Sequence, residues 1–162
     1  MDYKIPESVL VVIYTRELEV LLLKRADMHT WQSVTGSKDF LLESWLETAK
    51  REVMEETRID VDAPSCQLDD WGLENHYEIY PAYRHRYAPT VSHNLERVFG
   101  LEVPRDTPVA LSEREHTQYK WRPYLEAAGE VFSPSNAEAI LNLKNFLPAT
   151  RHPRGPTASK RP

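Results

Sequence analysis

The sequence predicts a single domain of the α/β class, in which helices cover a mixed β-sheet. Short apolar runs rich in β-branched residues predict strands, an amphipathic helix pattern lies between them, and a second helix pattern follows late in the chain. The chain has 162 residues, enough for one domain with a substantial core and too few for two typical domains. Strands on both sides of a central helix, with a late second helix, favour an α/β/α sandwich.

Two strands are expected at the start of the chain. The sequence of Val9–Tyr14 is VLVVIY, a short β-branched run that is typical of a buried strand. Arg16 and Glu17 predict a turn, after which Glu19–Lys24 returns as a second strand.

The central helix is predicted at Trp45–Thr57. Ser44 and Glu47 have the spacing of a capping box, in which the serine hydroxyl and the glutamate carboxylate bind each other's backbone N–H groups. The helix should therefore begin directly after Ser44 and pack on the sheet through one apolar stripe. That stripe consists of Leu46, Ala49 and Val53.

The second half of the chain predicts three further strands, at Tyr77–Tyr83, Arg97–Val103 and Tyr119–Trp121. A second capping box, from Ser135 to Glu138, predicts a helix that continues to about Phe146. The apolar side of this helix would be Ala139, Ile140, Leu143 and Phe146.

The end of the chain has a different composition. From residue 148 to residue 162 it is rich in proline, basic and poor in large apolar residues. We therefore expect a folded domain over residues 1–147 and a disordered tail over residues 148–162.

Composition narrows the classes of function. The formal net charge of −5 argues against broad binding to nucleic acid or to membrane surfaces. No run of 18 apolar residues predicts a transmembrane helix, and the first residues lack the pattern of a secretion signal. Cys66 is the single cysteine and fits a reducing compartment, so we expect a cytoplasmic protein. The six histidines lack the spacing of a zinc site.

A cluster of carboxylates in the central helix points to chemistry. Glu52, Glu55 and Glu56 follow Arg51 and share about 100° of one helical face. Their mutual repulsion is relieved when a cation lies among them, and Mg²⁺ prefers carboxylate oxygens together with substrate phosphates. The alternative is a solvated helix face without a ligand.

The wider pattern around these glutamates resembles the Nudix box of the Nudix hydrolases, which cleave pyrophosphate linkages. Gly36 comes first, Glu43 follows, and seven residues later the box continues as REVMEE and closes at Ile59. Two features depart from the family pattern. Six residues instead of five separate Gly36 from Glu43, and Arg58 stands where the family usually has glycine. We expect the extra residue to be absorbed in the loop before the helix, where insertions are tolerated.

Further segments resemble the branch of that family that acts on dihydroneopterin triphosphate early in folate synthesis. They are KIPESVLVVIY, WQSVTGS, RHRYAP, EHTQYKW and SPSNAEAI, spread between residues 4 and 140. The resemblance implies a Nudix fold and a pyrophosphohydrolase that forms dihydroneopterin monophosphate and pyrophosphate. It also implies a small-molecule triphosphate as the binding partner.

The resemblance implies a metal site and a catalytic set. Glu52, Glu56 and Glu115 match the ligands of Mg²⁺, with Mn²⁺ as an alternative ion. Glu55 and Glu56 match the catalytic carboxylates, with Glu55 either the base that activates water or a further metal ligand. Arg51 matches the arginine that orients the carboxylates through ion pairs.

The same resemblance implies a set of substrate contacts. Lys4 and Arg25 would meet the triphosphate, and Thr35 would bind a ring or phosphate group. The other implied contacts border the pterin ring: Tyr77, Glu78, Ile79, Tyr80 and Ser133. Strand alternation would place Tyr77 and Ile79 on one face and Glu78 and Tyr80 on the other. Trp31 and Arg86 are interpreted as mainly structural.

Two other functions remain open at the level of sequence. The first is hydrolysis of nucleoside triphosphates such as dATP with the same chemistry. The second is a Nudix-fold module that binds a ligand without catalysis. The intact REVMEE motif argues against the second, and the pattern does not predict an oligomeric state.

Overall fold

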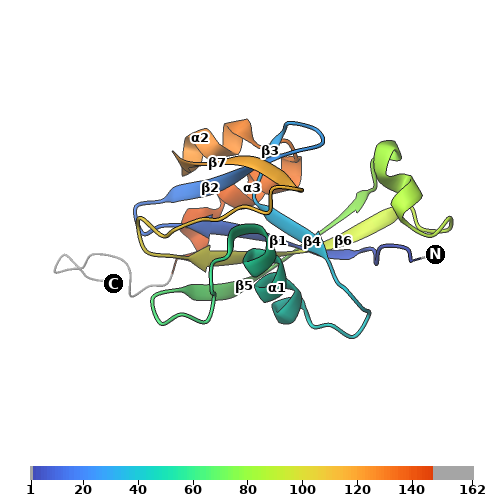
Figure 1. The fold of residues 1–162 in the computed structure, drawn as a ribbon, viewed down its shortest axis with the longest axis horizontal. Coiled ribbons are helices and arrows are strands. Elements are labelled where there is room, and N and C mark those ends of the chain that lie inside the picture. The colour runs from blue at the N-terminus through green and yellow to red at the C-terminus, as the bar shows by residue number, and fades with distance from the viewer. Residues whose placement is uncertain (1, 148–162) are drawn as a thin grey trace.

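A mixed sheet of seven strands lies between helices in the computed structural model of the protein, which describes residues 2–147 (Figure 1). The expected tail, residues 148–162, lies outside the described residues. The strands are β1 (Glu7–Tyr14), β2 (Glu19–Arg25), β3 (Trp31–Gln32), β4 (Val34–Ser37), β5 (Gln67–Glu78), β6 (His93–Glu102) and β7 (His116–Pro123). The α-helices are α1 (Trp45–Thr57), α2 (Tyr124–Glu130) and α3 (Pro134–Leu141). Two short 3₁₀ helices follow β5 and α3: η1 (Pro81–Arg86) and η2 (Leu143–Phe146).

The sheet combines both strand directions, as predicted. Its order is β3-β2-β1-β6-β5, with β1 and β6 parallel, while β4 pairs with β1 and β7 pairs with β2. Within residues 2–147, β1 and β2 pair at Tyr14 and Val20 alone. The two strands therefore diverge, and β4 occupies the free edge of β1.

Both faces of the sheet are buried, which explains the continuous apolar sequence of β1. Val9 and Val11 pack with Ala49 and Val53 of α1 on one face. On the other face, Leu10 and Val12 pack in a core cluster that includes Ala127 of α2 and Ile140 of α3. The predicted α/β/α sandwich is thus confirmed, with α1 on one side and α2 and α3 on the other.

Helix α1 begins and ends as predicted. The Ser44 hydroxyl accepts a hydrogen bond from the Glu47 backbone N–H, and the Glu47 carboxylate accepts one from the Ser44 backbone N–H. Ala49 and Val53 are buried, as expected, but the prediction for Leu46 is wrong. Leu46 lies in the first turn and is 45% exposed, while Glu52 and Glu56 of the same helix are buried.

The predicted strand at Tyr77–Tyr83 is wrong in its position. Strand β5 ends at Glu78, and the next segment forms η1, which starts at Pro81 because proline fits the first turn of a helix and cannot donate to a sheet ladder. The sequence pattern does not predict the earlier part of β5, because that part is polar and interrupted by a bulge. Gly72 occupies that bulge with φ of 72°, a conformation that glycine adopts without strain.

The other strands agree with the sequence in place but differ in length. Val9–Tyr14 and Glu19–Lys24 lie within β1 and β2, with the turn at Arg16 and Glu17 between them. Strands β6 and β7 are longer than the predicted Arg97–Val103 and Tyr119–Trp121.

The late helix starts earlier and ends earlier than predicted. The capping residue is Ser133, whose hydroxyl accepts from the Asn136 backbone N–H, so the expected capping box at Ser135 is wrong. Pro134 takes the first helical position, where its missing N–H is no loss. The helix stops at Leu141, and the predicted apolar residues beyond it still pack: Leu143 is buried and Phe146 stacks on Trp71 at 4.8 Å.

Helix α2 was not predicted, because its sequence, YLEAAGE, is a single short stretch directly after Pro123. None of the helices within residues 2–147 is long and apolar enough to cross a membrane.

Arg58 ends α1 in a left-handed conformation with φ of 65° and ψ of 15°. This is the position where the sequence departs from the family glycine, and the side chain there adds steric strain. We predict that Arg58→Gly stabilises the protein by about 0.5–1 kcal/mol, measured as the free energy of unfolding in urea. Arg58→Ala is the control, since it removes the charge but keeps the β-carbon. Equal stabilisation by both variants would show that the backbone conformation is not the cause.

Candidate active site

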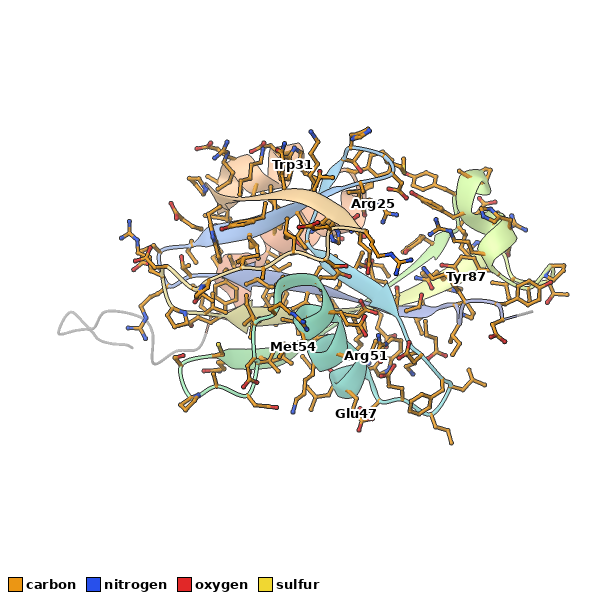
Figure 2. All side chains as sticks on the ribbon, viewed as in Figure 1. Arg25, Trp31, Glu47, Arg51, Met54 and Tyr87 are labelled. Carbon is orange, nitrogen blue, oxygen red and sulfur yellow. The ribbon has the colours of Figure 1, made fainter. Side chains whose placement is uncertain are left out.

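A cleft of about 1570 Å³ opens where α1, β4, η1 and the start of α3 meet the sheet. Figure 2 shows three residues of this region on separate elements: Arg25 on β2, Arg51 on α1 and Tyr87 after η1. The cleft is lined by every catalytic, metal and substrate residue that the sequence predicted. These are Lys4, Arg25, Thr35, Arg51, Glu52, Glu55, Glu56, Tyr77, Glu78, Ile79, Tyr80, Glu115 and Ser133.

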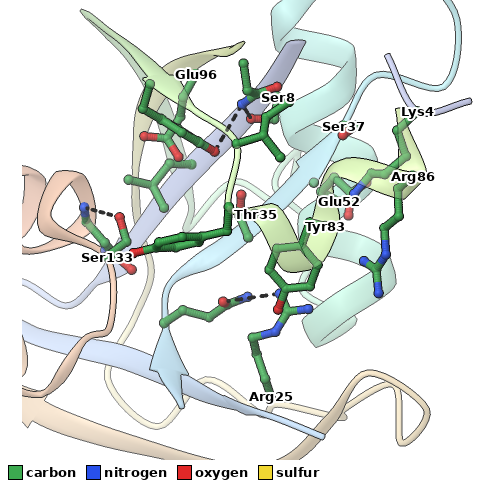
Figure 3. Close-up of a pocket in the computed structure, with 18 of the residues that line it drawn as sticks. Lys4, Ser8, Arg25, Thr35, Ser37, Glu52, Tyr83, Arg86, Glu96 and Ser133 are labelled. Carbon is green, nitrogen blue, oxygen red and sulfur yellow. Dashed lines mark hydrogen bonds between the residues drawn. The ribbon is translucent and has the colours of Figure 1, made fainter. Parts of the chain in front are cut away.

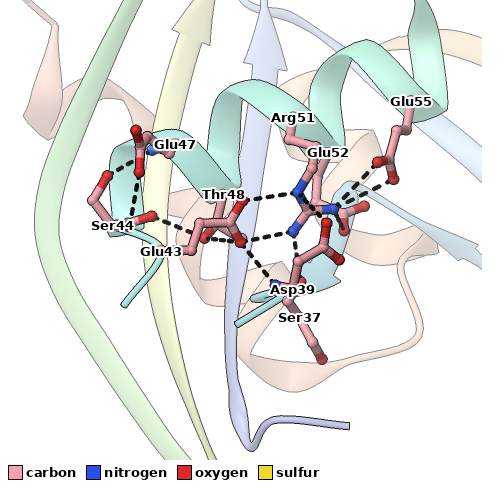
Figure 4. Close-up of polar contacts among 9 residues, drawn as sticks. All are labelled: Ser37, Asp39, Glu43, Ser44, Glu47, Thr48, Arg51, Glu52 and Glu55. Carbon is pink, nitrogen blue, oxygen red and sulfur yellow. Dashed lines mark hydrogen bonds and ion pairs between the residues drawn. The ribbon is translucent and has the colours of Figure 1, made fainter. Parts of the chain in front are cut away.

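Arg51 is the centre of a dense set of ion pairs (Figure 4). Its Nε and Nη2 atoms donate to the two oxygens of Glu43 at 2.9 and 3.0 Å. Its Nη1 atom lies 2.9 Å from Glu52 and 3.3 Å from Glu55, and Nη2 also donates to the Ser37 carbonyl. The guanidinium therefore holds carboxylates on three sides, and these contacts raise the pKa of Arg51.

Glu43 is a buried partner of that arginine and does not line the cleft. The hydrogen bonds from Arg51 hold the pKa of Glu43 down, to about 2, with help from the Asp39 backbone N–H and the Thr48 hydroxyl. The extra residue of the loop lies among exposed side chains, including Leu41 and Leu42. The loop thus absorbs the longer spacing, and Glu43 still reaches Arg51 in bidentate geometry.

Glu52 and Glu56 form a buried carboxyl pair on the next turn of α1. Burial raises the pKa of Glu52, and burial together with the charge of Glu52 raises the pKa of Glu56 well above its usual range. The Oε1 atom of Glu56 is buried without a hydrogen-bond partner. His116 lies 3.9 Å from that atom, but burial lowers its pKa to about 4, so near neutral pH it offers no positive charge.

Gly36 on β4 gives this pair its space. A β-carbon at Gly36 would lie 2.0 Å from the Glu52 carboxyl carbon, so any larger residue must displace that carboxylate. Val9 pairs with Gly36 across the sheet, which fixes how closely β4 approaches α1. The glycine of the sequence motif is therefore required for contact with Glu52.

The carboxyl pair fits a divalent cation. Two adjacent buried carboxyl groups with an unpartnered oxygen are the oxygen-rich site that such an ion prefers, and a cation there would offset the repulsion between their charges. Within residues 2–147, however, no three His, Cys, Asp or Glu side chains converge closely enough to hold a metal. Glu115 is exposed across the cleft, near enough for its charge to raise the pKa of Glu56.

Cationic groups line the cleft beside the carboxylates (Figure 3). Arg25 and Arg86 both lie over the ring of Tyr83, at 5.5 and 4.8 Å from its centre. Arg25 also makes two 2.8 Å hydrogen bonds to Asp27, which occupies its fork. Lys4 is tied to Arg86 through its backbone N–H, and its charged neighbours include Glu52 and Glu115. Arg86, interpreted as structural from sequence, therefore belongs to the cation cluster.

Aromatic side chains line another part of the cleft. Tyr80 lies 5.6 Å from Phe132, ring centre to ring centre, and both rings are about half exposed. Because β5 ends at Glu78, the expected alternation does not continue, and all four residues from 77 to 80 line the cleft. Ile79 is buried among them.

The remaining predicted contacts have partners within the protein. The Thr35 hydroxyl donates to the Val9 carbonyl at 2.9 Å, so it can offer a ligand only an acceptor. Ser133 caps α3, and its hydroxyl lies 2.9 Å from that of Ser135. Asn136 exchanges two hydrogen bonds with Ser33, which fixes the start of α3 beside the sheet.

Sequence reasoning missed the polar residues at the ends of two paired strands. Asn94 and Glu96 on β6 line the cleft and are buried, and Asn75 and Tyr77 face them from β5. A signal exists in the sequence, because residues 94 and 96 are polar at alternate positions that continue as the buried Val98. The expected strand begins only at Arg97 and therefore does not include residues 94 and 96.

Comparison with known proteins gives consistent results. A family model described as NUDIX domain matches residues 4–143. The chain is 41% identical over 140 residues to the dihydroneopterin triphosphate diphosphatase of Escherichia coli K12, covering 85% of this chain and 91% of that protein. It is also 41% identical over 142 residues to the protein of the same name from Haemophilus influenzae, covering 86% and 88%.

A solved structure agrees with these similarities. The E. coli dihydroneopterin triphosphate pyrophosphohydrolase matches with a TM-score of 0.80 and 41% identity, covering 90% of this chain and 97% of that one. The range matched by the family model includes Lys4, Ser133 and all cleft residues between them.

Gly36→Ala should leave the fold intact and disable the carboxyl pair. The added methyl group meets the far end of the Glu52 side chain, which can move, so the melting temperature should change little. If Glu52 takes part in the reaction as expected, displacement of its carboxylate should lower pyrophosphate release by about 100-fold, the usual cost of misplacing an active-site group by about 1 Å. Gly129→Ala is the matched control, because a β-carbon there meets no atom within 4 Å. Wild-type turnover in Gly36→Ala would contradict the assigned close approach.

Proposed function

Because this chain belongs to the Nudix hydrolase family, we propose that it hydrolyses dihydroneopterin triphosphate to dihydroneopterin monophosphate and pyrophosphate. The observation that carries the proposal is one cleft in which buried carboxylates, a cation cluster and aromatic side chains meet. Relatives that are 41% identical over most of their length bear the corresponding name.

The two parts of the cleft suit the two parts of this substrate. Lys4, Arg25 and Arg86 would bind the triphosphate. The Arg25 guanidinium would then donate to phosphate oxygens the two hydrogen bonds that it now donates to Asp27. The flat pterin ring would pack near Tyr80 and Phe132, where aromatic faces are exposed.

Nudix hydrolases generally use a divalent metal ion, and we propose Mg²⁺ here, with Mn²⁺ as an alternative. Glu52 and Glu56 would hold it from α1, with Glu115 as a further ligand from the loop before β7. When bound, the ion would neutralise phosphate charge and lower the pKa of a water molecule.

The protein's own groups would orient this chemistry and move the proton. Arg51 fixes Glu52 and Glu55 by ion pairs and so limits their rotation. Glu55 is half exposed to the cleft and paired with Arg51, which suits it to accept a proton from the attacking water at a carboxylate oxygen. Glu56 is the second candidate, because its buried Oε1 atom has no hydrogen-bond partner among the described residues.

We predict that Glu56→Gln and Glu115→Gln each lower turnover in saturating Mg²⁺, the first by about 1000-fold or more. The reason is that the amide keeps the shape of the side chain and removes its charge. Pyrophosphate release from dihydroneopterin triphosphate, compared with dATP, measures both the loss and the substrate preference.

Glu113→Gln is the matched control for this experiment. Glu113 lies two residues from Glu115 on the same loop, is exposed and does not line the cleft, so its variant should match wild type. Wild-type turnover in Glu56→Gln would refute the metal assignment. A wild-type preference for dATP in direct competition would replace the pterin with a nucleotide.

A further inference from the structure

We propose that Glu96 recognises the substrate ring by accepting hydrogen bonds from a 2-amino-4-oxopyrimidine edge, and so determines which bases the enzyme accepts. This inference rests on the proposed function, because it concerns the ring of the same triphosphate substrate. It assigns a specificity role to a residue on β6, outside the carboxylate cluster of α1.

Glu96 is a buried carboxyl group in the wall of the cleft. It is 4% exposed, yet it lines the cleft, and Figure 3 shows it well apart from Lys4, Arg86 and Glu52. An acidic group in such a place is costly to bury unless it has a partner. The hydrogen bonds that Glu96 makes therefore determine what else its carboxylate can bind.

The two oxygens of Glu96 differ in their contacts. Ser135 donates to Oε1 at 2.9 Å and Asn75 donates to the same atom at 3.2 Å. Among the described residues, no donor contacts Oε2. The carboxylate is thus fixed through one oxygen, while the other remains available to a ligand in the cleft.

Asn94, the nearest amide on the same strand, does not donate to that second oxygen. Asn94, two residues earlier on the same strand face, gives its N–H groups to Ser8 and Tyr77. The amide oxygen of Asn94 is buried without a hydrogen-bond partner. Oε2 of Glu96 is therefore an acceptor without a donor from the described residues, and a ligand that carries N–H donors would complement it.

A pterin carries such donors on its pyrimidine edge. The ring N–H and the adjacent exocyclic amino group point the same way, which suits a carboxylate, as it suits an acidic side chain that reads a base edge. Guanine has the same edge. Adenine presents a ring acceptor beside its amino group, so it would place a lone pair against the carboxylate.

Glu96→Gln tests this assignment with little change in shape. The glutamine oxygen can keep the bonds from Ser135 and Asn75, so its amide nitrogen would take the place of Oε2. At that position the substitution replaces a hydrogen-bond acceptor with a donor. We expect kcat/KM for dihydroneopterin triphosphate and for dGTP to fall by about 100-fold, with dATP unchanged or improved.

Glu126→Gln, on the exposed side of α2 and outside the cleft, is the control and should match wild type on all three substrates. Equal losses of kcat/KM for the three substrates, or no loss for any of them, would overturn the assignment. If the variant does not fold, the assignment can be tested with wild-type protein. Its kcat/KM for dITP, which lacks the 2-amino group, should be lower than that for dGTP by about 10-fold or more. Equal kcat/KM for dITP and dGTP would overturn it.

Binding of neopterin, which has no phosphate, separates this inference from the proposed function. Tighter binding to wild type than to Glu96→Gln supports ring recognition whether or not hydrolysis occurs. Absence of pyrophosphate release from dihydroneopterin triphosphate by wild type would refute the proposed function alone. Equal neopterin affinity in both proteins would refute the role of Glu96 alone.

Discussion

The site depends on how the protein keeps several carboxylates close together on one helix. Arg51 offsets part of their mutual repulsion. Its guanidinium forms a bidentate ion pair with Glu43 and further ion pairs with Glu52 and Glu55. Glu56 lies beyond that reach, buried against Glu52 with an unpartnered oxygen. Charge that Arg51 does not balance must be balanced by a proton or by a bound cation, and this is why we propose a metal site on this face of α1.

The sheet positions the other half of the cleft. Divergence of β1 from β2 leaves an edge for β4, which brings Gly36 against Glu52. Pairing of β5 with β6 places polar side chains opposite one another at the far end, below the start of α3. The proposed metal-binding face and the proposed ring-binding face therefore come from different layers of one sandwich. The chemistry can be shared across the family while ring recognition varies with β5, β6 and α3.

Local sequence signals predicted the parts of the site that depend on local structure. The cap at Ser44 and the glutamate spacing follow from helix geometry, so α1 and its carboxylate face could be placed in advance. Glu96 and Asn94 could not, because their surroundings arise from strand pairing across distant residues. Strand β5 ends earlier than predicted because Pro81 starts a 3₁₀ helix. The N-cap is Ser133 instead of the predicted Ser135, because Pro134 suits the first helical position.

The pH dependence of folding in metal-free protein tests the carboxyl pair most directly. A carboxyl group whose pKa is raised by folding stabilises the protein below its unfolded pKa of about 4.3, and that stability is lost as pH rises through the folded pKa. Urea unfolding in EDTA should therefore show Glu56→Gln gaining stability over wild type as pH rises from about 5 to 8. Subtracting the variant cancels the contributions of titrating groups that lie far from Glu56. Saturating Mg²⁺ should then raise the free energy of unfolding of wild type more than that of Glu56→Gln. A wild-type-minus-variant difference that does not change with pH or Mg²⁺ would contradict the account.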